Sequence, residues 1–327
     1  MNYLLKPLKV GNLTLGNRLV MPPLVTDKAD AYGKVTNEML DFYKDKTQGG
    51  YVSLIIVENS YICREGKFDK RQLSITDDSM IEGLNKLADA IHSNGSKCIM
   101  QINHAGGKAN EKEIGTIPVG PSAFSDNSVR ELCRQEIENL VQIYGDAAGR
   151  VKAAGFDGVE IHSAHGFLLN QFYSPLINKR TDNYGGDVYN RIRIHLEIIN
   201  MIRSVVGKDF TISLRLGAAD YLKGGTTIED SLIAAAEFEK AGVNILSISG
   251  GLLGFTIPGV TEQGYFAPLS EAIKKVVALP IILTGGITHA KAAERLLIDN
   301  KADLIGVGRA MLMDSKWAKT AVETLKL

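Results

Sequence analysis

The stretch that decides the fold is PIILTGGITHAKAAERLLIDNKADLIGVGR, residues 280–309. Its two ends, residues 280–286 and 303–309, are short and nearly all apolar up to their glycines. Short apolar runs of this kind are expected for parallel strands that are buried on both faces of a sheet. The segment between them, residues 289–302, has the apolar spacing of a helix. The stretch therefore predicts a strand–helix–strand unit.

The same alternation runs through the rest of the chain. Six further apolar runs precede this unit, at residues 18–23, 52–59, 97–104, 156–162, 210–216 and 244–251. Helical patterns lie between them, among others at residues 77–95, 190–207 and 226–242. Eight strand–helix units without an obvious linker predict an α/β fold, one (β/α)8 TIM barrel domain over residues 1–327. A doubly wound sheet is the structural alternative.

Three segments stand outside this repeat. Residues 8–17, LKVGNLTLGN, alternate around Gly11-Asn12 and predict a hairpin that plugs the bottom of the barrel. Two long connections, residues 104–128 and 162–187, leave the C-terminal ends of strands, where barrels carry their chemistry. Long loops at that end are expected to cover a substrate.

Composition excludes several classes of protein. The 327 residues are 45% hydrophobic and 23% charged, and 37 basic residues balance 37 acidic ones. A formal net charge of zero gives no sign of the basic surface that nucleic acid or an anionic membrane would bind. The three cysteines lie far apart without metal-binding spacing, and no apolar run reaches about 18 residues. These features predict a cytoplasmic protein without a disulfide framework or a metal site.

Polar groups at the strand ends predict a phosphate-binding site and are compatible with a flavin. Strands at residues 280–286 and 303–309 end in Gly285-Gly286 and Gly308-Arg309, the usual seat of a phosphate in barrels. Gln101 and Arg215 end two other strands and could contact the polar edge of a flavin. The alternative is internal pairing, in which Glu160 neutralises Arg215. Both arrangements can hold at once.

His162 and His165 follow one strand at its entry into a long loop. A zinc site would need a third protein ligand, for which His104 is the remaining strand-end histidine. As hydrogen-bond donors, the two histidines could instead hold a carbonyl oxygen and stabilise negative charge that develops on it. We predict the hydrogen-bonding role for the two histidines.

Residues 162–193, HSAHGFLLNQFYSPLINKRTDNYGGDVYNRIR, resemble the signature of the Old Yellow Enzyme family of FMN-dependent ene-reductases. The resemblance extends over essentially the whole chain, through GNRLVMPPL, VEN, MQINHAGGK, LRLGAADY and GVGRAML. It implies a barrel that carries tightly bound FMN across its C-terminal mouth, reduced by NADH or NADPH. Reduced FMN then passes hydride to the β-carbon of an activated alkene.

The resemblance also implies a role for individual residues. His162 and His165 hold the carbonyl, nitro or phenolate oxygen of the substrate. The phosphate of FMN lies on Gly286, Gly308 and Arg309. The remaining FMN contacts are Pro22, Pro23, Leu24, Val25, Asn59, Gln101 and Arg215.

Several positions depart from the family pattern. Phe167 stands where relatives usually keep the tyrosine that protonates the α-carbon, so the proton must come from water or another donor such as Tyr61, Tyr173 or Tyr265. Val25 replaces a Thr or Cys that tunes the flavin, and Tyr189 replaces a Glu. Because the chain ends at Leu327, no iron–sulfur motif or nucleotide domain is expected to follow.

The sequence therefore predicts an FMN-dependent NAD(P)H oxidoreductase whose acceptor is an enone-type alkene, a quinone or a nitro compound. Two alternatives stay open: a flavin-binding redox sensor with little turnover, and a flavin-free lyase or isomerase with His162 and His165 as acid and base. The expected partners are a small-molecule substrate and a nicotinamide cofactor, and a homo-oligomer is compatible with the sequence.

Overall fold

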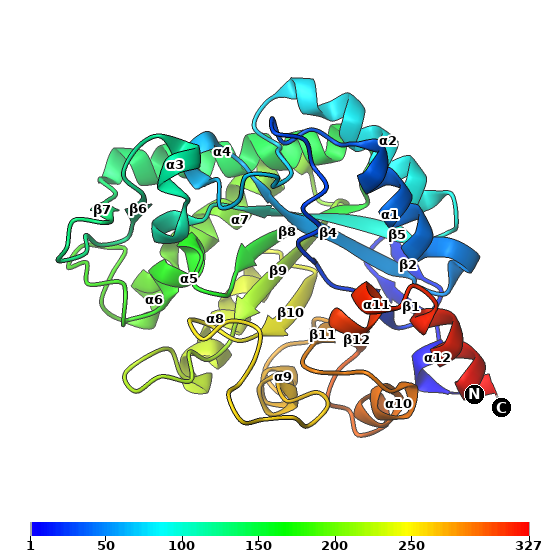
Figure 1. The fold of residues 1–327 in the computed structure, drawn as a ribbon. Helices are drawn as coiled ribbons and strands as arrows, with labels where there is room; N and C mark the ends of the chain where they lie inside the picture. The colour runs from blue at the N-terminus through cyan, green and yellow to red at the C-terminus, as the bar shows by residue number, and fades with distance from the viewer. Residues whose placement is uncertain (1, 327) are drawn as a thin grey trace.

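The computed structural model describes residues 2–326. Eight parallel strands close into a barrel, as predicted (Figure 1). In their order around the barrel they are β3 (Leu19–Met21), β4 (Leu54–Tyr61), β5 (Lys97–Asn103), β8 (Gly158–Ser163), β9 (Thr211–Gly217), β10 (Ile245–Ser249), β11 (Ile281–Leu283) and β12 (Leu304–Gly306). Each lies within, or within two residues of, one of the eight apolar runs.

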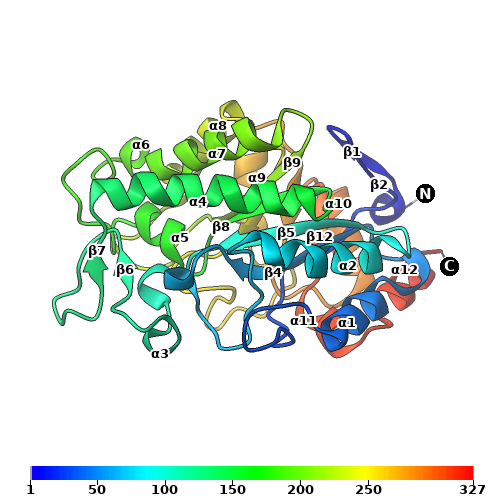
Figure 2. The ribbon, with the colours of Figure 1, turned by 90° about the horizontal axis from the view of Figure 1, so that it is seen from above.

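Helices surround the barrel on the outside (Figures 1 and 2). They are α1 (Asn37–Thr47), α2 (Ile81–His92), α4 (Arg134–Ala153), α7 (Arg193–Val206), α8 (Ile228–Lys240), α9 (Ala267–Lys274), α10 (Ala290–Ile298), α11 (Arg309–Met313) and α12 (Trp317–Lys326). Helix α8 begins with a capping box in which Thr227 and Asp230 satisfy each other's backbone N–H groups. The two described ends of the chain meet, because the Asn2 side chain donates to the carbonyl of Leu325.

The predicted hairpin closes one end of the barrel. Strands β1 (Leu8–Val10) and β2 (Leu13–Leu15) pair antiparallel around Gly11, whose φ of 55° suits glycine. Their apolar side chains pack on the first inward-facing layer of the barrel: Val20, Leu54, Ile56, Ile99, Ile245, Ile282 and Leu304. Figure 2 places the hairpin and the long loops at opposite ends of the molecule.

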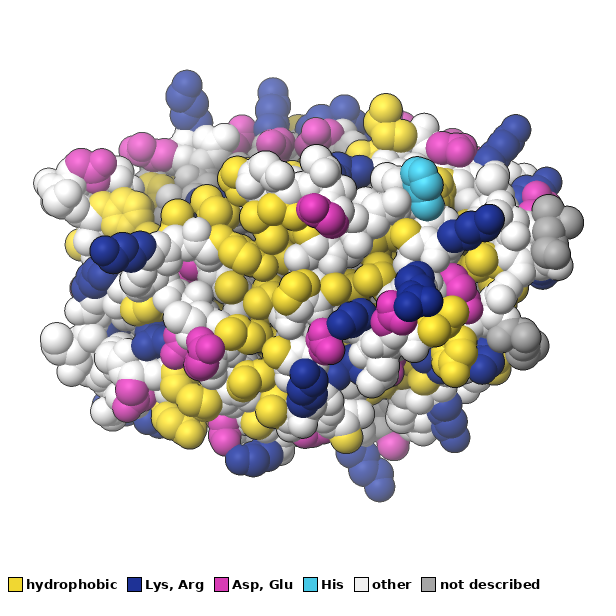
Figure 3. Space-filling model, turned by 90° about the horizontal axis from the view of Figure 1, so that it is seen from below, with side chains coloured by type: hydrophobic (Ala, Val, Ile, Leu, Met, Phe, Trp, Pro, Cys, Tyr) yellow, Lys and Arg dark blue, Asp and Glu magenta, His cyan; other side chains and the backbone are white. Residues whose placement is uncertain are grey.

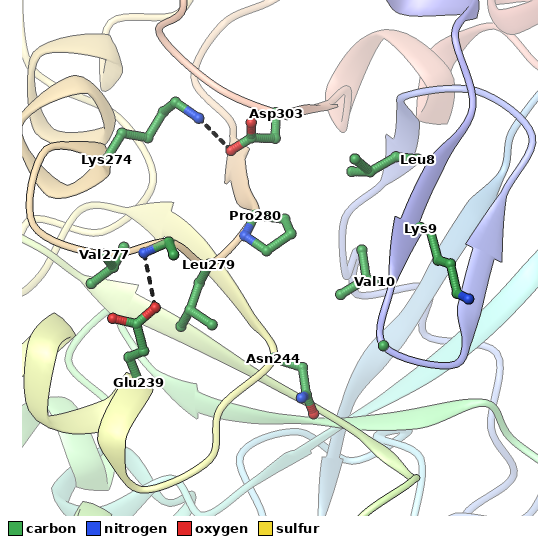
Figure 4. Close-up of a pocket in the computed structure, with 12 residues that line it drawn as sticks. Leu8, Lys9, Val10, Glu239, Asn244, Lys274, Val277, Leu279, Pro280 and Asp303 are labelled. Carbon is green, nitrogen blue, oxygen red and sulfur yellow. Dashed lines mark hydrogen bonds and ion pairs between the residues drawn. The ribbon is translucent and has the colours of Figure 1, made fainter.

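A cavity of about 470 Å³ lies between this hairpin and the N-terminal ends of the strands (Figure 4). Several of its polar groups already have partners within the protein. Lys274 pairs with Asp303 at 2.5 Å, and the Glu239 carboxylate accepts from the backbone N–H of Ala278 at 2.8 Å. The unpartnered histidine and arginine described below lie at the other end of the barrel.

The two long loops carry secondary structure of their own. The first contains α3 (Glu111–Ile114) and one strand of a parallel pair, β6 (Val119–Gly120) with β7 (Arg130–Glu131). The second contains α5 (Leu168–Tyr173), and α6 (Val188–Arg191) follows it. Short 3-10 helices complete the chain at Tyr3–Leu5, Gln48–Gly50, Arg64–Gly66, Asp78–Met80 and Gly106–Lys108. Within residues 2–326, no helix combines the length and the hydropathy that a membrane crossing requires.

Candidate active site

The two histidines come together at the C-terminal end of β8. His162 is the penultimate residue of the strand, and His165 lies in the turn that follows, with a left-handed φ of 60°. Their ring centroids are 5.1 Å apart at an interplanar angle of 82°. His165 Nε2 lies 2.7 Å from Ser249 Oγ, while His162 makes no side-chain hydrogen bond to any described residue and its Nδ1 is buried.

Both imidazoles are neutral at pH 7. Burial is the main cause that lowers their pKa well below the ordinary value of 6.5, and the charges of Arg215 and Lys108 lower the pKa further. A neutral imidazole carries one N–H and one acceptor nitrogen. If the Ser249 hydroxyl donates to His165 Nε2, the proton of His165 sits on Nδ1 and is free to donate.

Phe167 forms the apolar wall beside the histidines. Its ring packs edge-on against His162 at 5.0 Å and against Phe68 at 5.3 Å between centroids. It belongs to a small buried cluster with Ala105, Ala109 and Ile114. The ammonium of Lys108 lies 5.7 Å from the centre of the Phe167 ring and donates to the carbonyl of His165 at 2.7 Å.

Arg215 lies two residues before the C-terminal end of β9, beside His162, its register partner on β8. Glu160 is occupied otherwise, since it accepts from Gln101 Nε2 and from Ser213 Oγ, both at 2.8 Å. Its charge still opposes the burial that lowers the pKa of Arg215. No ion pair or hydrogen bond of the Arg215 guanidinium is found within residues 2–326, and its Nε is buried without a partner. Glu160 therefore acts on Arg215 only through its charge, without a direct hydrogen bond. The donors of the guanidinium remain available for a ligand.

The glycines after β11 and β12 form a tight seat. Gly285 and Gly286 have φ of 122° and 65°, and a Cβ on Gly286 would lie 2.7 Å from the Tyr265 ring. On the other side, a Cβ on Gly308 would meet Leu24 at 3.2 Å and Pro22 at 3.5 Å. The structure thus brings the ends of β3, β11 and β12 together, as the predicted FMN contacts require.

Arg309 reaches the same seat through Tyr265. Its Nη2 donates to the Tyr265 hydroxyl at 3.3 Å, and that hydroxyl donates to the carbonyl of Phe255 at 2.6 Å. Tyr265 therefore lies at the glycine seat, with its hydroxyl bound to Arg309 and to the carbonyl of Phe255. The other tyrosines considered as proton donors are also engaged elsewhere: Tyr173 is fully buried against Ser231, and the Tyr61 hydroxyl points to the carbonyl of Tyr32. Tyr189 is 55% exposed on α6.

Glu58 positions the segment that follows β3, a role the sequence did not reveal. Strand β4 shifts register between Val57 and Ser60, so Glu58 and Asn59 lie in a bulge. The buried Glu58 carboxylate accepts from the backbone N–H and the hydroxyl of Thr26, at 2.9 and 2.7 Å. These bonds hold the chain just after Pro22–Val25. Asn59 is buried with its carbonyl bound by Gln72, and Val25 is 48% exposed.

Glu58→Gln is expected to remove a pH dependence of stability. Burial raises the pKa of Glu58 from 4.5 to about 7, so between these values the folded protein holds a proton that the unfolded chain has released. The stabilisation of the folded protein by this extra proton is fully present below pH 4.5 and is lost as the pH rises to about 7. The free energy of unfolding falls by roughly 3 kcal/mol over this range. Urea unfolding of both proteins at about pH 5 and about pH 8 measures it. A stability difference that is the same at both pH values would contradict the assignment.

A model of the NADH:flavin oxidoreductase / NADH oxidase family matches residues 3–327. The chain belongs to this family. Among curated relatives, an NADH oxidase of Thermoanaerobacter brockii is 41% identical over 325 residues, covering 96% of the chain and 50% of that protein. A metal reductase of Desulforamulus reducens is 36% identical over 330 residues, covering 98% and 49%. The chain thus spans about half the length of these members of the NADH:flavin oxidoreductase family.

Solved structures of the same architecture agree. A 2-naphthoyl-CoA reductase in complex with 2-naphthoyl-CoA is 30% identical with a TM-score of 0.93, over 98% of the chain and 52% of that protein. Morphinone reductase in complex with tetrahydroNAD is 27% identical with a TM-score of 0.84, over 98% and 90%. The Old Yellow Enzyme resemblance and its barrel are therefore confirmed, while the role of each site residue stays a prediction.

The described residues suit the FMN that the NADH:flavin oxidoreductase family implies. The guanidinium of Arg215 lacks a protein partner, and Gln101 Oε1 accepts no hydrogen bond from a described residue. Both can face the polar edge of a flavin, whose oxygens and nitrogens accept and donate hydrogen bonds. Gly286 and Gly308 leave no room for side chains where a phosphate would approach the backbone.

A second polar cluster lies at the N-terminal end of β5, far from this site in the barrel. His92 Nε2 is 2.7 Å from Asp157 Oδ2 and 3.3 Å from Cys98 Sγ. Asp157 also accepts from the backbone N–H of Cys98 and pairs with Lys97. Burial raises the pKa of the Cys98 thiol. These contacts tie β5 to the preceding and following loops, and they account for the cluster as structural.

Proposed function

We propose that this chain is an FMN-dependent NAD(P)H oxidoreductase whose acceptor binds through an oxygen to His162 and His165. The acceptors that fit are enone-type alkenes, quinones and nitro compounds. FMN, when bound, supplies the redox chemistry, since it takes hydride from NADH or NADPH and gives it to the acceptor. The cofactor would be held by Arg215, Gln101 and the glycine seat with Arg309, and by the segment Pro22–Val25 with Asn59.

The observation that carries the proposal is the adjacency of two unpartnered groups. His162 and Arg215 are register partners on β8 and β9, and no residue between positions 2 and 326 forms a hydrogen bond with either side chain. Buried polar groups without partners are costly, so each is expected to be completed by a ligand. The two neutral histidines and the cationic Arg215 suit an acceptor whose oxygen gains negative charge beside an electron-rich cofactor.

The loops at the mouth favour an apolar acceptor. Exposed hydrophobic side chains after β9 and β10 include Tyr221, Leu222, Leu253 and Phe255. Phe255 packs against His165 at 6.0 Å between ring centroids. In Figure 1 these loops lie on the lower side of the molecule, and Figure 3 shows hydrophobic side chains gathered across the middle of the face seen from below. Apolar walls around a few polar groups are typical of small-molecule sites.

The experiment that tests the proposal follows the two half-reactions separately. Protein reconstituted with FMN is mixed anaerobically with NADH or NADPH, and bleaching of the flavin absorbance reports reduction. Reoxidation is then followed with an enone, a quinone, a nitroarene and a soluble high-valent metal salt, the last because one relative is a metal reductase. Protein that cannot take up FMN, or that neither nicotinamide reduces, would overturn the proposal.

A redox sensor with little turnover is the second candidate, and Phe167 is the observation that favours it. The Phe167 ring has no proton to give, and its neighbours Phe68, Ala105 and Ile114 are apolar. Uniformly slow reoxidation by every acceptor in the panel would favour the sensor. Fast reoxidation by quinone with slow reoxidation by enone would instead show an enzyme limited by proton delivery.

Phe167→Tyr is expected to speed enone reduction, by up to about 10²-fold, while changing flavin reduction little. The new hydroxyl would lie beside His162 and could protonate the α-carbon, and general acid help is worth roughly 10²–10⁴-fold. Stopped-flow reoxidation with an enone measures the effect. Quinone serves as the control acceptor because its reduction needs no proton on carbon. An equal change for both acceptors would mean that the substitution alters binding rather than proton transfer.

A further inference from the structure

The loop between β5 and α3 supplies a group with a transferable proton beside Phe167. Lys108 ends the 3-10 helix Gly106–Lys108 and folds back over the turn that carries the histidines. Its Nζ donates to the carbonyl of His165 at 2.7 Å and lies 5.7 Å from the centre of the Phe167 ring. A Cβ on Gly166 would lie 2.9 Å from the same nitrogen, so the ammonium packs closely against the backbone of Gly166.

Lys108 has no counter-ion. It takes part in no ion pair with a carboxylate within residues 2–326. By contrast, Lys67, whose carbonyl accepts from the backbone N–H of Asn110 in the same loop, pairs with Glu113 at 2.8 Å. An ammonium has three donors, and the recorded bond to His165 uses one of them. The titratable groups that it influences, His162 and His165, are both neutral. An uncompensated cation at this point favours negative charge on whatever lies between it and the histidines.

We propose that Lys108 is the general acid that protonates the α-carbon of an alkene acceptor, the step for which Phe167 has no proton. The inference rests on the proposed function. Hydride adds to the β-carbon, and the electron pair of the C=C bond moves onto the acceptor oxygen held by the two histidines. The α-carbon then takes a proton from Lys108 Nζ, which becomes a neutral amine and is reprotonated by water. NAD(P)H, one proton and the alkene are consumed, and NAD(P)⁺ and the saturated product are formed.

Chemistry and position support Lys108 over the other donors. Tyr173 and Tyr61 have their hydroxyls bound to Ser231 and to the carbonyl of Tyr32, and Tyr265 lies on the glycine seat. Partial burial lowers the pKa of Lys108 from its usual 10.5, which makes its ammonium a stronger acid than that of a free lysine. The flexible stem of lysine lets the ammonium leave the His165 carbonyl and reach a bound substrate.

Two variants separate the proton from the charge. Lys108→Met keeps an apolar stem and removes both, while Lys108→Arg keeps the charge but gives up no proton near neutral pH. Both are expected to lower the rate of enone reduction by about 10²-fold. Lys108→Arg keeps the charge and should reduce quinone near the wild-type rate, while the lost charge in Lys108→Met should lower quinone reduction by a smaller factor than enone reduction. Lys112→Met, an exposed lysine of α3, is the matched control and should behave as wild type.

A rescue and a binding measurement complete the test. Phe167→Tyr should restore enone reduction in the Lys108→Met background by a larger factor than it changes the wild type. Binding of a para-substituted phenol, followed by the change in flavin absorbance, should weaken in Lys108→Met and persist in Lys108→Arg, because phenolate binding needs only the charge.

The outcomes distinguish the inference from the proposed function. An enone-to-quinone rate ratio that Lys108→Met leaves unchanged, or full enone reduction by Lys108→Arg, would overturn the role of Lys108 alone. If the nicotinamides do not bleach FMN in the wild type, or if the wild type does not reduce quinone, the proposed function fails and the inference fails with it. A variant that fails to bind FMN is replaced in the comparison by Lys108→Gln, which keeps a polar head without an acidic proton.

Discussion

His162→Ala is expected to lower kcat/KM for enone and quinone acceptors by about 10²–10³-fold while the FMN content stays that of the wild type. The loss is that of one hydrogen-bond donor aimed at developing negative charge in a site shielded from water. His162 suits this role because its buried imidazole is neutral and has no protein partner to give up when the acceptor arrives. Steady-state kinetics with a saturating nicotinamide measure the effect.

His162→Asn is the matched variant, because its amide retains an N–H donor at a similar reach. It should recover a substantial part of the rate that alanine loses. Reduction of FMN by the nicotinamide should be affected less than reoxidation in both variants, since the acceptor oxygen is the group that gains charge. If alanine at position 162 leaves acceptor turnover intact, the acceptor is held elsewhere and the proposed role of the histidine pair fails.

Arg215→Met is expected to yield protein that loses FMN on purification. A hydrogen bond to a charged group contributes about 1.5–3 kcal/mol, which corresponds to a fall in affinity of roughly 10- to 100-fold. Titration of the apoprotein with FMN, followed by quenching of the flavin fluorescence, gives the Kd. Arg215→Lys keeps the charge without the planar fork and should lie between the two.

The same variant should not destabilise the apoprotein. No acceptor for Arg215 is found among the described residues, and Glu160 keeps its two hydrogen bonds from Gln101 and Ser213 when the guanidinium is removed. Thermal unfolding of the apoprotein is therefore expected to stay within a few degrees of the wild type. A large fall in Tm would mean that Arg215 serves the fold, and an unchanged Kd for FMN would mean that it does not serve the flavin.

The architecture followed from local pattern because each strand is buried on both faces. The run at residues 156–162 became β8 (Gly158–Ser163), and the alternation around Gly11 became the hairpin β1–β2. The last two strands are shorter than their apolar runs. Strand β11 ends at Leu283, ahead of the positive φ angles of Gly285 and Gly286, and Arg309 already begins α11 after β12. The glycines that follow these strands therefore set the backbone geometry at the predicted phosphate site.

The partners of the site residues could not be predicted, because they are contacts between distant parts of the chain. The sequence left open whether Glu160 pairs internally with Arg215, and the structure shows Gln101 and Ser213 bound to its two oxygens. The bond between Glu58 and Thr26 depends on a bulge in β4 that no pattern marks. The ammonium of Lys108 reaches His165 across 57 residues of sequence. Hydrophobic spacing carries no information on such pairs.

The hairpin that seals one end of the barrel has a consequence for how proteins of this shape diversify. The residues that pack the sealed end of the barrel and those proposed to meet the acceptor lie at opposite ends of the molecule, so they come from different segments of the chain. Substitutions and insertions in the connections that carry Lys108, Phe167 and Phe255 leave the sealed layer untouched. Such substitutions are expected to change acceptor preference with little change in the free energy of folding. The loops at the C-terminal mouth of the barrel are therefore the place to engineer acceptor preference.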